Sequence, residues 1–218
     1  ARWGEQLPST LHCTCALFIL MKLLGNRGAF RALSYPDFFW FWSSYFVSNV
    51  GSWMQSIAQG WLLFELTSSP FYLGLFSSLR MVLLLCFFVL GGLMSDRWER
   101  RKVMLWIQAI AALTALGLAL LVSSKTIEVW HIFVLGAITS TTWAFEQPVR
   151  QALIPQLVQR EDLVNALALN AVVWNGAGFL GPGLVGLLVG SIGIDGCFYI
   201  NVVSYLAVIG ALLRMRVP

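Results

Sequence analysis

Six long apolar segments constrain this chain more than any other feature of its sequence. They run over residues 38–64, 71–93, 103–122, 129–147, 164–190 and 194–213. A helix of about 20 residues crosses the roughly 30 Å hydrocarbon core of a bilayer, and each segment is close to that length or longer. The sequence therefore predicts an all-α integral membrane protein with six transmembrane helices.

The composition agrees with this class and excludes others. Apolar residues make up 58% of the chain and charged residues 11%, whereas a soluble globular chain carries about 25% charged residues. A soluble fold would not cover its surface with so few charges, and a disordered chain would be far less apolar. The net charge of +4 does not indicate nucleic-acid binding, because the basic residues are few and lie between the apolar segments.

The basic residues alternate between the loops. The amino-terminal stretch, every second loop and the carboxyl-terminal end hold Lys22, Arg27, Arg31, Arg97, Arg100, Arg101, Lys102, Arg150, Arg160, Arg214 and Arg216. The intervening loops hold Lys125 alone. By the positive-inside rule, this pattern places both termini in the cytoplasm. We therefore expect a multi-pass protein of the cell (inner or plasma) membrane whose outer surface contacts the lipid bilayer.

Polar side chains within the apolar segments are candidate contacts for a solute. The first and fifth segments hold Asn49, Gln55, Gln59, Asn170 and Asn175. In lipid such groups face other helices or a cavity. Arg80 lies nine residues into the second segment, near the middle of the bilayer, where a charge costs about 2.5–3.5 kcal/mol. It needs a carboxylate, a cavity or a substrate, and no acid is an obvious partner at that depth.

The sequence gives no sign of covalent chemistry. It lacks the G-x-x-x-x-G-K-[ST] loop that binds nucleotide phosphates, and His12 and His131 lie in the amino-terminal stretch and at a segment end. Cys13 and Cys15 resemble half of a metal site, but no second pair completes it. We expect no enzyme activity, metal or cofactor. Movement of a small-molecule substrate is the function that remains for a helical bundle with polar residues inside.

Two motifs indicate parts that pack closely or move. The loop between the second and third segments contains Gly92, Asp96, Arg97, Arg100 and Arg101; such a basic cluster is also typical of a plain anchor on the cytoplasmic side. The fifth segment contains Gly181, Pro182 and Gly186. There the proline removes a backbone donor and the glycines allow a neighbouring helix to approach, so this stretch is either a packing face or a pivot.

Both motifs resemble signatures of the major facilitator superfamily. The loop follows the pattern G-x-x-x-D-R-x-G-R-[RK], with Glu99 in place of the second glycine. The fifth segment resembles the antiporter motif, with Ala168, Ala177 and Val185 in place of three glycines. Residues 48–55, 63–70, 146–155 and 165–170 look like the enterobactin-exporter-like, or transmembrane secretion effector, branch, and the resemblance covers residues 35–213.

The resemblance implies a twelve-helix bundle of two halves around a substrate cavity. This chain resembles the N-terminal half, so its expected partner is a C-terminal six-helix half or a second chain. Residues 1–33 then form an N-terminal extension that is mis-started or disordered. Residues 34–213 form the half-transporter domain, and residues 214–218 begin a cytoplasmic linker.

The resemblance also implies a charge network at the cytoplasmic gate. By position, Asp96 and Arg100 belong to it, with Glu146 as the expected partner of Arg100 and Arg150 nearby. The implied function is secondary active export of amphipathic small molecules, such as drugs or siderophores, by alternating access. Proton coupling is expected, although no acid lies in the middle of a predicted segment. A non-transporting fragment and the membrane subunit of an ATP-driven transporter are the alternatives left open.

Overall fold

The computed structural model describes residues 28–97 and 99–215, and the side chains of all of these except residues 28, 29 and 89–97. This part of the chain is helical throughout and contains no strand, which confirms the predicted all-α class. Its elements are η1 (Gly28–Ser34, a 3-10 helix), α2 (Pro36–Thr67), α3 (Pro70–Arg97), α4 (Arg100–Ser123), α5 (Val129–Leu157), η2 (Arg160–Asp162) and α6 (Leu163–Arg214).

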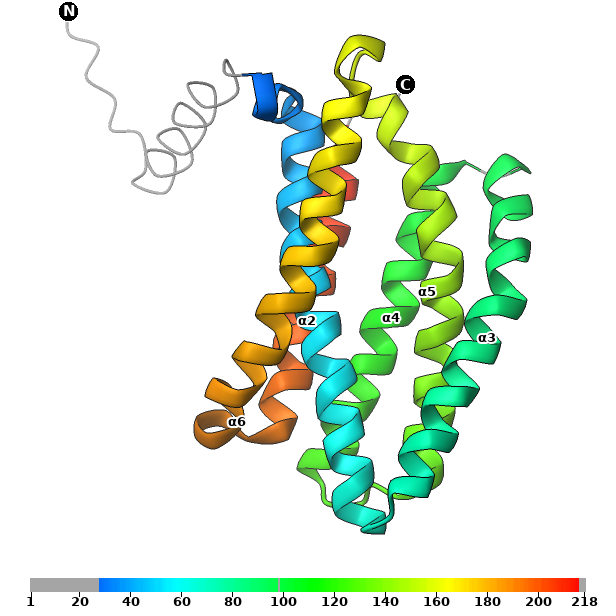
Figure 1. Ribbon diagram of the computed structural model, residues 1–218, viewed down its shortest axis with the longest axis vertical. Coiled ribbons are helices and arrows are strands. Elements are labelled where there is room, and N and C mark those ends of the chain that lie inside the picture. Colours follow the sequence, from blue (N-terminus) through cyan, green and yellow to red (C-terminus); the bar gives the residue numbers. More distant parts are fainter. Residues whose placement is uncertain (1–27, 98, 216–218) are drawn as a thin grey trace, which may run out of the picture.

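Helix α6 reverses direction at Gly193. This residue has φ 75° and ψ 175°, which interrupts the helical conformation, and a positive φ costs glycine little because it has no Cβ. Figure 1 shows the resulting turn at the lower end of the bundle. The turn separates two arms, residues 163–192 and 194–214, and it falls between the fifth and sixth predicted segments.

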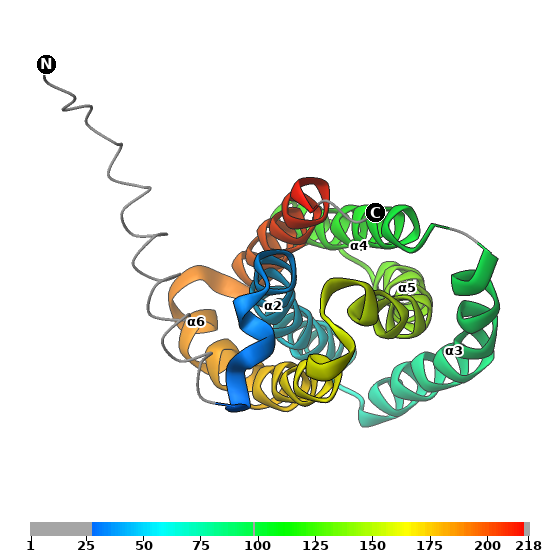
Figure 2. The same ribbon diagram turned by 90° about the horizontal axis from the view of Figure 1, so that it is seen from above.

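The helices form an elongated bundle in which α2 has a central place. Helix α2 packs mainly against α6, which also packs against α4, while α5 lies between α3 and α4. Figure 2 shows α3 at the edge of the bundle. The turns after α2 and α4 lie at the same end as the Gly193 turn, whereas the reversals after α3 and α5 lie at the opposite end (Figure 1).

Three stretches of the described chain are long and apolar enough to cross a membrane: Pro70–Phe88, Arg100–Ser123 and Arg160–Arg214. Helices α2 and α5 have the length but not the hydropathy. The reason is their buried polar side chains, which include Asn49 and Gln55 in α2 and Glu146 in α5. The count of six spans therefore stays a prediction, and the two less apolar helices are those with the most polar interiors.

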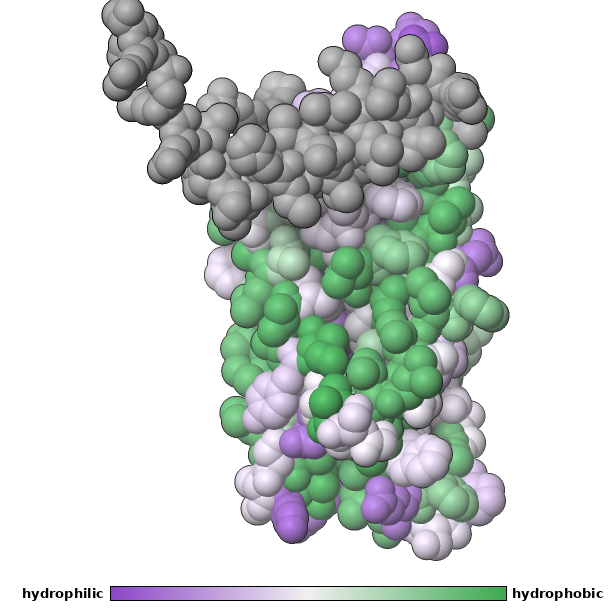
Figure 3. Space-filling view, turned by 90° about the vertical axis from the view of Figure 1, so that its left-hand side faces the viewer, coloured by the Kyte–Doolittle hydropathy of each residue, from purple (hydrophilic) through white to green (hydrophobic). Residues whose placement is uncertain are grey.

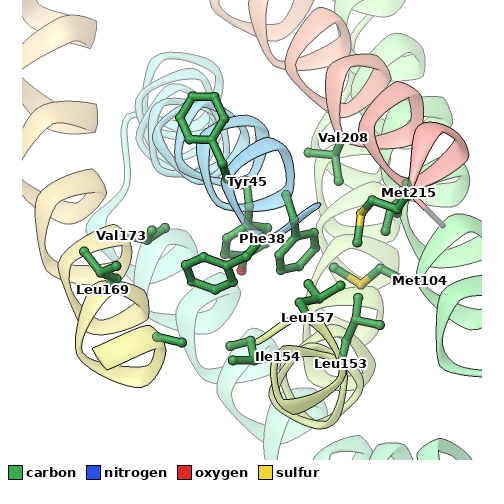
Figure 4. Close-up of a cluster of buried hydrophobic side chains, with 14 of the residues drawn as sticks. Phe38, Tyr45, Met104, Leu153, Ile154, Leu157, Leu169, Val173, Val208 and Met215 are labelled. Carbon is green, nitrogen blue, oxygen red and sulfur yellow. The ribbon is translucent and has the colours of Figure 1, made fainter. Parts of the chain in front are cut away.

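Apolar side chains lie both on the outer surface and in the core, as is typical of a membrane protein. Large apolar residues stay exposed on the outer faces, among them Phe71 and Leu85 of α3 and Phe179 and Leu187 of α6. Figure 3 shows apolar residues over the middle of one such face and hydrophilic residues near the lower end. Figure 4 shows a buried cluster where α2, α4, α5 and both arms of α6 meet, near the ends of α5 and α6.

The segment before α2 is fixed to the start of α6 through Asp162. This residue of η2 is 4% exposed, pairs with Arg31 at 3.3 Å and accepts a hydrogen bond of 2.8 Å from the hydroxyl of Tyr35. That hydrogen bond raises the pKa of Tyr35. Residues 28–34, most of which fall within the predicted N-terminal extension, are therefore held against the start of α6. Residues 1–27 lie outside the described part.

Replacing Asp162 by alanine is expected to lower the free energy of unfolding by about 1–3 kcal/mol, because it removes a charge-assisted hydrogen bond. The matched control is Glu161→Ala, since Glu161 is the exposed neighbour and its loss should have little effect. The measurement is helix content during titration from mild detergent into dodecyl sulfate. Because the pKa of Tyr35 is raised in the folded state, the contribution of the Tyr35–Asp162 hydrogen bond to the free energy of unfolding should be present at neutral pH. It should be lost as the pH rises through that pKa. Equal effects of both variants would contradict this role of Asp162.

Candidate functional site

A polar cavity of about 90 Å³ lies inside the bundle. Helices α2, α3, α4, α5 and the second arm of α6 all contribute to its wall. Its lining residues are Asn49, Ser52, Trp53, Ser56, Arg80, Ala111, Thr139, Thr142, Trp143, Glu146 and Tyr205. A larger cavity between α3, α4 and α5 has an almost entirely apolar lining that includes Phe87 and Trp106. The polar cavity, with two charged residues on its wall, is therefore the candidate site.

Arg80 reaches this cavity from the peripheral helix α3. Its guanidinium donates hydrogen bonds to the hydroxyl of Ser56 at 2.7 Å and to that of Ser140 at 3.1 Å. It also lies 5.6 Å from the centre of the Phe76 ring. Of the three surroundings that the sequence required for Arg80, the described residues supply the cavity and no carboxylate within ion-pair distance.

Glu146 is enclosed by the bundle and lies farther from the end of its helix than the sequence indicated. The fourth segment was expected to end at Gln147, but α5 continues to Leu157, eleven residues beyond Glu146. The carboxylate is 7% exposed, lines the cavity and accepts a hydrogen bond of 3.1 Å from Gln108 of α4. The hydroxyl of Tyr45 in α2 also contacts it. Glu146 is thus a buried acid at the inner wall of the site.

The expected ion pair between Arg100 and Glu146 is not formed in the structure. Arg100 instead donates a 2.8 Å hydrogen bond to the carbonyl oxygen of Ala152 near the end of α5. Arg101 donates to the carbonyls of Leu212 and Leu213 at the end of α6. Arg101 thus lies beside the partial negative charge at the carboxyl end of α6, whereas Arg100 joins α4 to a carbonyl oxygen before the last turn of α5. The side chains of Gly92, Asp96 and Arg97 lie outside the described residues, so the rest of the predicted gate stays a prediction.

Arg150 and Asn170 come together, but Asn175 lies elsewhere. The buried guanidinium of Arg150 donates hydrogen bonds to the side-chain oxygens of Asn170 and Gln147. It also lies 4.7 Å from the centre of the Tyr45 ring. Asn175 is exposed and donates to the carbonyl of Ala171 one turn earlier. None of these residues lines the polar cavity, although Arg150 lies one helical turn from Glu146.

Gln55 and Gln59 are buried between helices and do not line the cavity. Gln55 accepts a hydrogen bond of 2.7 Å from Asn201, and the side-chain nitrogens of Gln55 and Gln59 have no partner in the structure. The sequence reasoning missed Asn201, as well as Tyr205, whose hydroxyl is 2.9 Å from that of Ser52. The available signal was the presence of three polar residues, Asn201, Ser204 and Tyr205, within an otherwise apolar segment.

The glycines of the fifth segment have two different surroundings. A Cβ at Gly181 would lie 2.5 Å from Cβ of Trp53 and 3.3 Å from the backbone oxygen of Val50, whereas a Cβ at Gly186 would meet nothing within 4 Å. Pro182 is exposed beside them. Gly181 is therefore a contact with α2, and Gly186 lies on an open face of the first arm of α6.

Three tryptophans from three helices form a continuous aromatic group beside the cavity. The rings of Trp143 in α5 and Trp174 in α6 stack with their centres 5.0 Å apart and planes 24° apart. The ring of Trp53 in α2 meets Trp174 edge-on at 6.1 Å. Trp53 and Trp143 also line the cavity, so an aromatic wall faces the same space as Arg80 and Glu146.

A helical bundle with an apolar exterior and charged residues lining an internal cavity belongs to the class of integral membrane proteins. Comparison with known families identifies the family within this class. The chain belongs to the transmembrane secretion effector family of the major facilitator superfamily, whose family model matches residues 27–218. This confirms the resemblance found in the sequence.

The similar curated proteins are transporters. The staphyloferrin A transporter of Staphylococcus aureus is 25% identical over 150 residues, which are 68% of this chain and 38% of that protein. Macrolide efflux protein A of Streptococcus pyogenes is 26% identical over 151 residues, 69% of this chain and 37% of that protein. The enterobactin exporter EntS of Shigella boydii is 26% identical over 174 residues, 80% of this chain and 40% of that protein. The chain thus spans less than half the length of these relatives. No solved structure matches.

Proposed function

We propose that this chain is the N-terminal half of a secondary active transporter that exports amphipathic small molecules by alternating access. The observation that carries the proposal is the buried cavity that Arg80 and Glu146 line together. The family assignment supports a transport function, and the names of two relatives, an efflux protein and an exporter, support the outward direction. The relatives' greater length supports a second half as the partner.

The positions of the chain reversals support the six-span topology and the cytoplasmic placement of both termini. The reversals after α3 and α5 lie at one end of the bundle, together with the start of α2 and the end of α6 (Figure 1). These are the loops and ends that hold most of the basic residues, whereas Lys125 lies in a turn at the other end. One end therefore carries the excess of positive charge that faces the cytoplasm in multi-pass proteins.

The sequence placed Glu146 at the end of a predicted segment and no acid in the middle of one; because Glu146 lines the cavity in the structure, we assign it as the proton carrier. Its carboxylate accepts from Gln108 when ionised. The side-chain oxygen of Gln108 has no hydrogen-bond partner among the described residues, so a rotation of that amide offers an acceptor to the protonated acid. The same neighbour thus serves both protonation states, which a group that gains and loses a proton during each cycle requires.

The test is uptake into everted membrane vesicles that contain the complete natural protein, with enterobactin and erythromycin as probes chosen from the relatives' names. A pH gradient, acid inside, is expected to drive accumulation of at least one probe without ATP, and a protonophore is expected to abolish it. Vesicles without the protein are the control. Accumulation that needs ATP, or none with either probe, would contradict the proposed function.

A further inference from the structure

The positive charge of Arg80 is held in place but not neutralised within the described part of the chain. Its two hydrogen-bond partners are the neutral hydroxyls of Ser56 and Ser140. The ion pairs of the described residues join Arg31 to Asp162 and Lys102 to Glu99 instead. A guanidinium fork matches the oxygens of a carboxylate or a phosphate, so this arrangement presents a positioned cation to whatever enters the cavity.

Two cavities reach the Arg80 side chain. The cavity described above is about 90 Å³, and a second cavity of about 230 Å³ lies between α3 and α5. Ser56, Arg80 and Trp143 line both of them. The guanidinium and one indole therefore lie between two neighbouring cavities, where one ligand can contact both groups.

The other charged group of the cavity is compensated within the chain. Glu146 accepts a hydrogen bond from Gln108, and it also interacts with the positive charge of Arg150, which lies one helical turn further along α5. The unmatched charge of the cavity is thus positive. An entering molecule that is anionic gains from Arg80, whereas a cation meets an unfavourable field.

The aromatic wall defines the rest of the ligand. Trp53 and Trp143 line the cavity, and the ring of Trp174, which does not line it, contacts both, with ring centres 6.1 and 5.0 Å apart. Indole rings bury large apolar surfaces and favour stacked or edge-to-face contact with another ring. A flat apolar group next to the anionic group would find a matching surface here.

Building on the proposed function, we infer that this cavity selects amphipathic anions. Arg80 binds the anionic oxygens, and Trp143 with Trp53 contacts a flat apolar or aromatic part of the same molecule. This assigns Arg80 as the residue that determines charge specificity, whichever route the substrate takes across the membrane.

The test is equilibrium binding to the purified complete protein, which needs no transport and therefore fails independently of the proposed function. Three probes share one ring system and differ in charge: 2-naphthoate, neutral 2-naphthamide and cationic 2-naphthylmethylammonium. Naphthoate is expected to bind at least about tenfold more tightly than the other two, as charge-assisted hydrogen bonds allow. Equal binding of all three, or preference for the cation, would overturn the inference.

Variants test which residues produce the preference for naphthoate. Arg80→Gln is expected to abolish the advantage of naphthoate, Arg80→Lys to retain it in weaker form, and Trp143→Ala to weaken all three probes alike. Lys102→Gln is the matched control for loss of one positive charge, because Lys102 is exposed and pairs with Glu99 at 2.6 Å. If Arg80→Gln does not fold, the order of the three probe affinities in wild type and in Arg80→Lys decides the question.

A phospholipid headgroup is the other source of anionic oxygens. Naphthoate binding is therefore repeated in detergent alone and with phosphatidylglycerol added. Naphthoate binding that is unchanged by added phosphatidylglycerol supports a small amphipathic anion as the ligand. Displacement of naphthoate by phosphatidylglycerol in wild type but not in Arg80→Gln would show a lipid site and overturn the inference.

Discussion

Replacing Glu146 by glutamine is expected to abolish proton-driven accumulation of substrate by the complete protein. With one proton exchanged per substrate, a gradient of one pH unit supports about tenfold accumulation, because one pH unit corresponds to about 1.4 kcal/mol. Vesicles that contain Glu146→Gln are expected to stop at about equal concentrations on both sides, since an amide does not carry the proton. The measurement is the ratio of internal to external enterobactin in everted vesicles at a fixed pH gradient.

The surroundings of Glu146 separate this effect from misfolding. Glutamine has nearly the shape of glutamate and keeps an oxygen that accepts the hydrogen bond from Gln108. The groups that face the carboxylate or share its cavity come from every neighbouring helix: Tyr45 (α2), Arg80 (α3), Gln108 (α4), Arg150 (α5) and Tyr205 (α6). Because these groups stay in place, counterflow exchange of substrate without a gradient should persist in the variant.

An acid just before the same helix gives the matched control. Glu128 precedes α5, is exposed and accepts a 2.6 Å hydrogen bond from the ring nitrogen of Trp130. Glu128→Gln is expected to accumulate enterobactin as the wild type does. Normal gradient-dependent accumulation by Glu146→Gln would place the coupling proton on another group and remove Glu146 from the mechanism.

The sequence was sufficient for the helical class because the apolar segments are long and the turns between them are short. Arg80 and Asn49, two of the residues that the sequence suggested as contacts for a solute, line the same cavity, because a charge or an amide within an apolar segment is stable only beside other polar groups or a cavity. Their contact with a substrate stays a prediction. The reversal at Gly193 was predictable as well, because residues 191–195 interrupt an apolar stretch that is too long for one span.

The length of the helix that carries Glu146 was underestimated for a specific physical reason. Pro148, Arg150 and Pro155 follow it within ten residues, and proline normally interrupts a helix. Helix α5 nevertheless continues through both prolines. Tight packing compensates for the lost backbone hydrogen bonds: Val149, Leu153 and Ile154 are almost fully buried in the cluster of Figure 4.

The rotation of each helix about its own axis was the other feature that the sequence did not provide. Gln55 and Asn49 are both polar residues of α2, yet one meets Asn201 and the other lines the cavity. Asn175 and Asn170 of α6 differ in the same way, because one is exposed and the other meets Arg150. Tertiary contacts alone decide which polar residue faces which neighbour.

Replacing Gly181 by leucine is expected to destabilise the described bundle strongly, because the side chain would be forced into α2. The nearest atoms belong to Trp53 and to the backbone of Val50 and Met54, and backbone atoms do not give way as a flexible side chain does. Overpacking of this kind costs about 1–3 kcal/mol. The measurement is the free energy of unfolding from a titration of mild detergent with dodecyl sulfate.

Gly186→Leu is the matched variant, because it places the same side chain on the same arm of α6 where no atom lies within 4 Å. It is expected to leave the free energy of unfolding nearly unchanged. A loss as large as that of Gly181→Leu would show that the α2–α6 contact is not what the glycine protects. In the complete protein, Gly186→Leu is expected to slow transport while folding stays intact, because the proposed second half has to pack against that open face. The pair therefore separates a glycine needed for packing within this half from one needed for contact between halves.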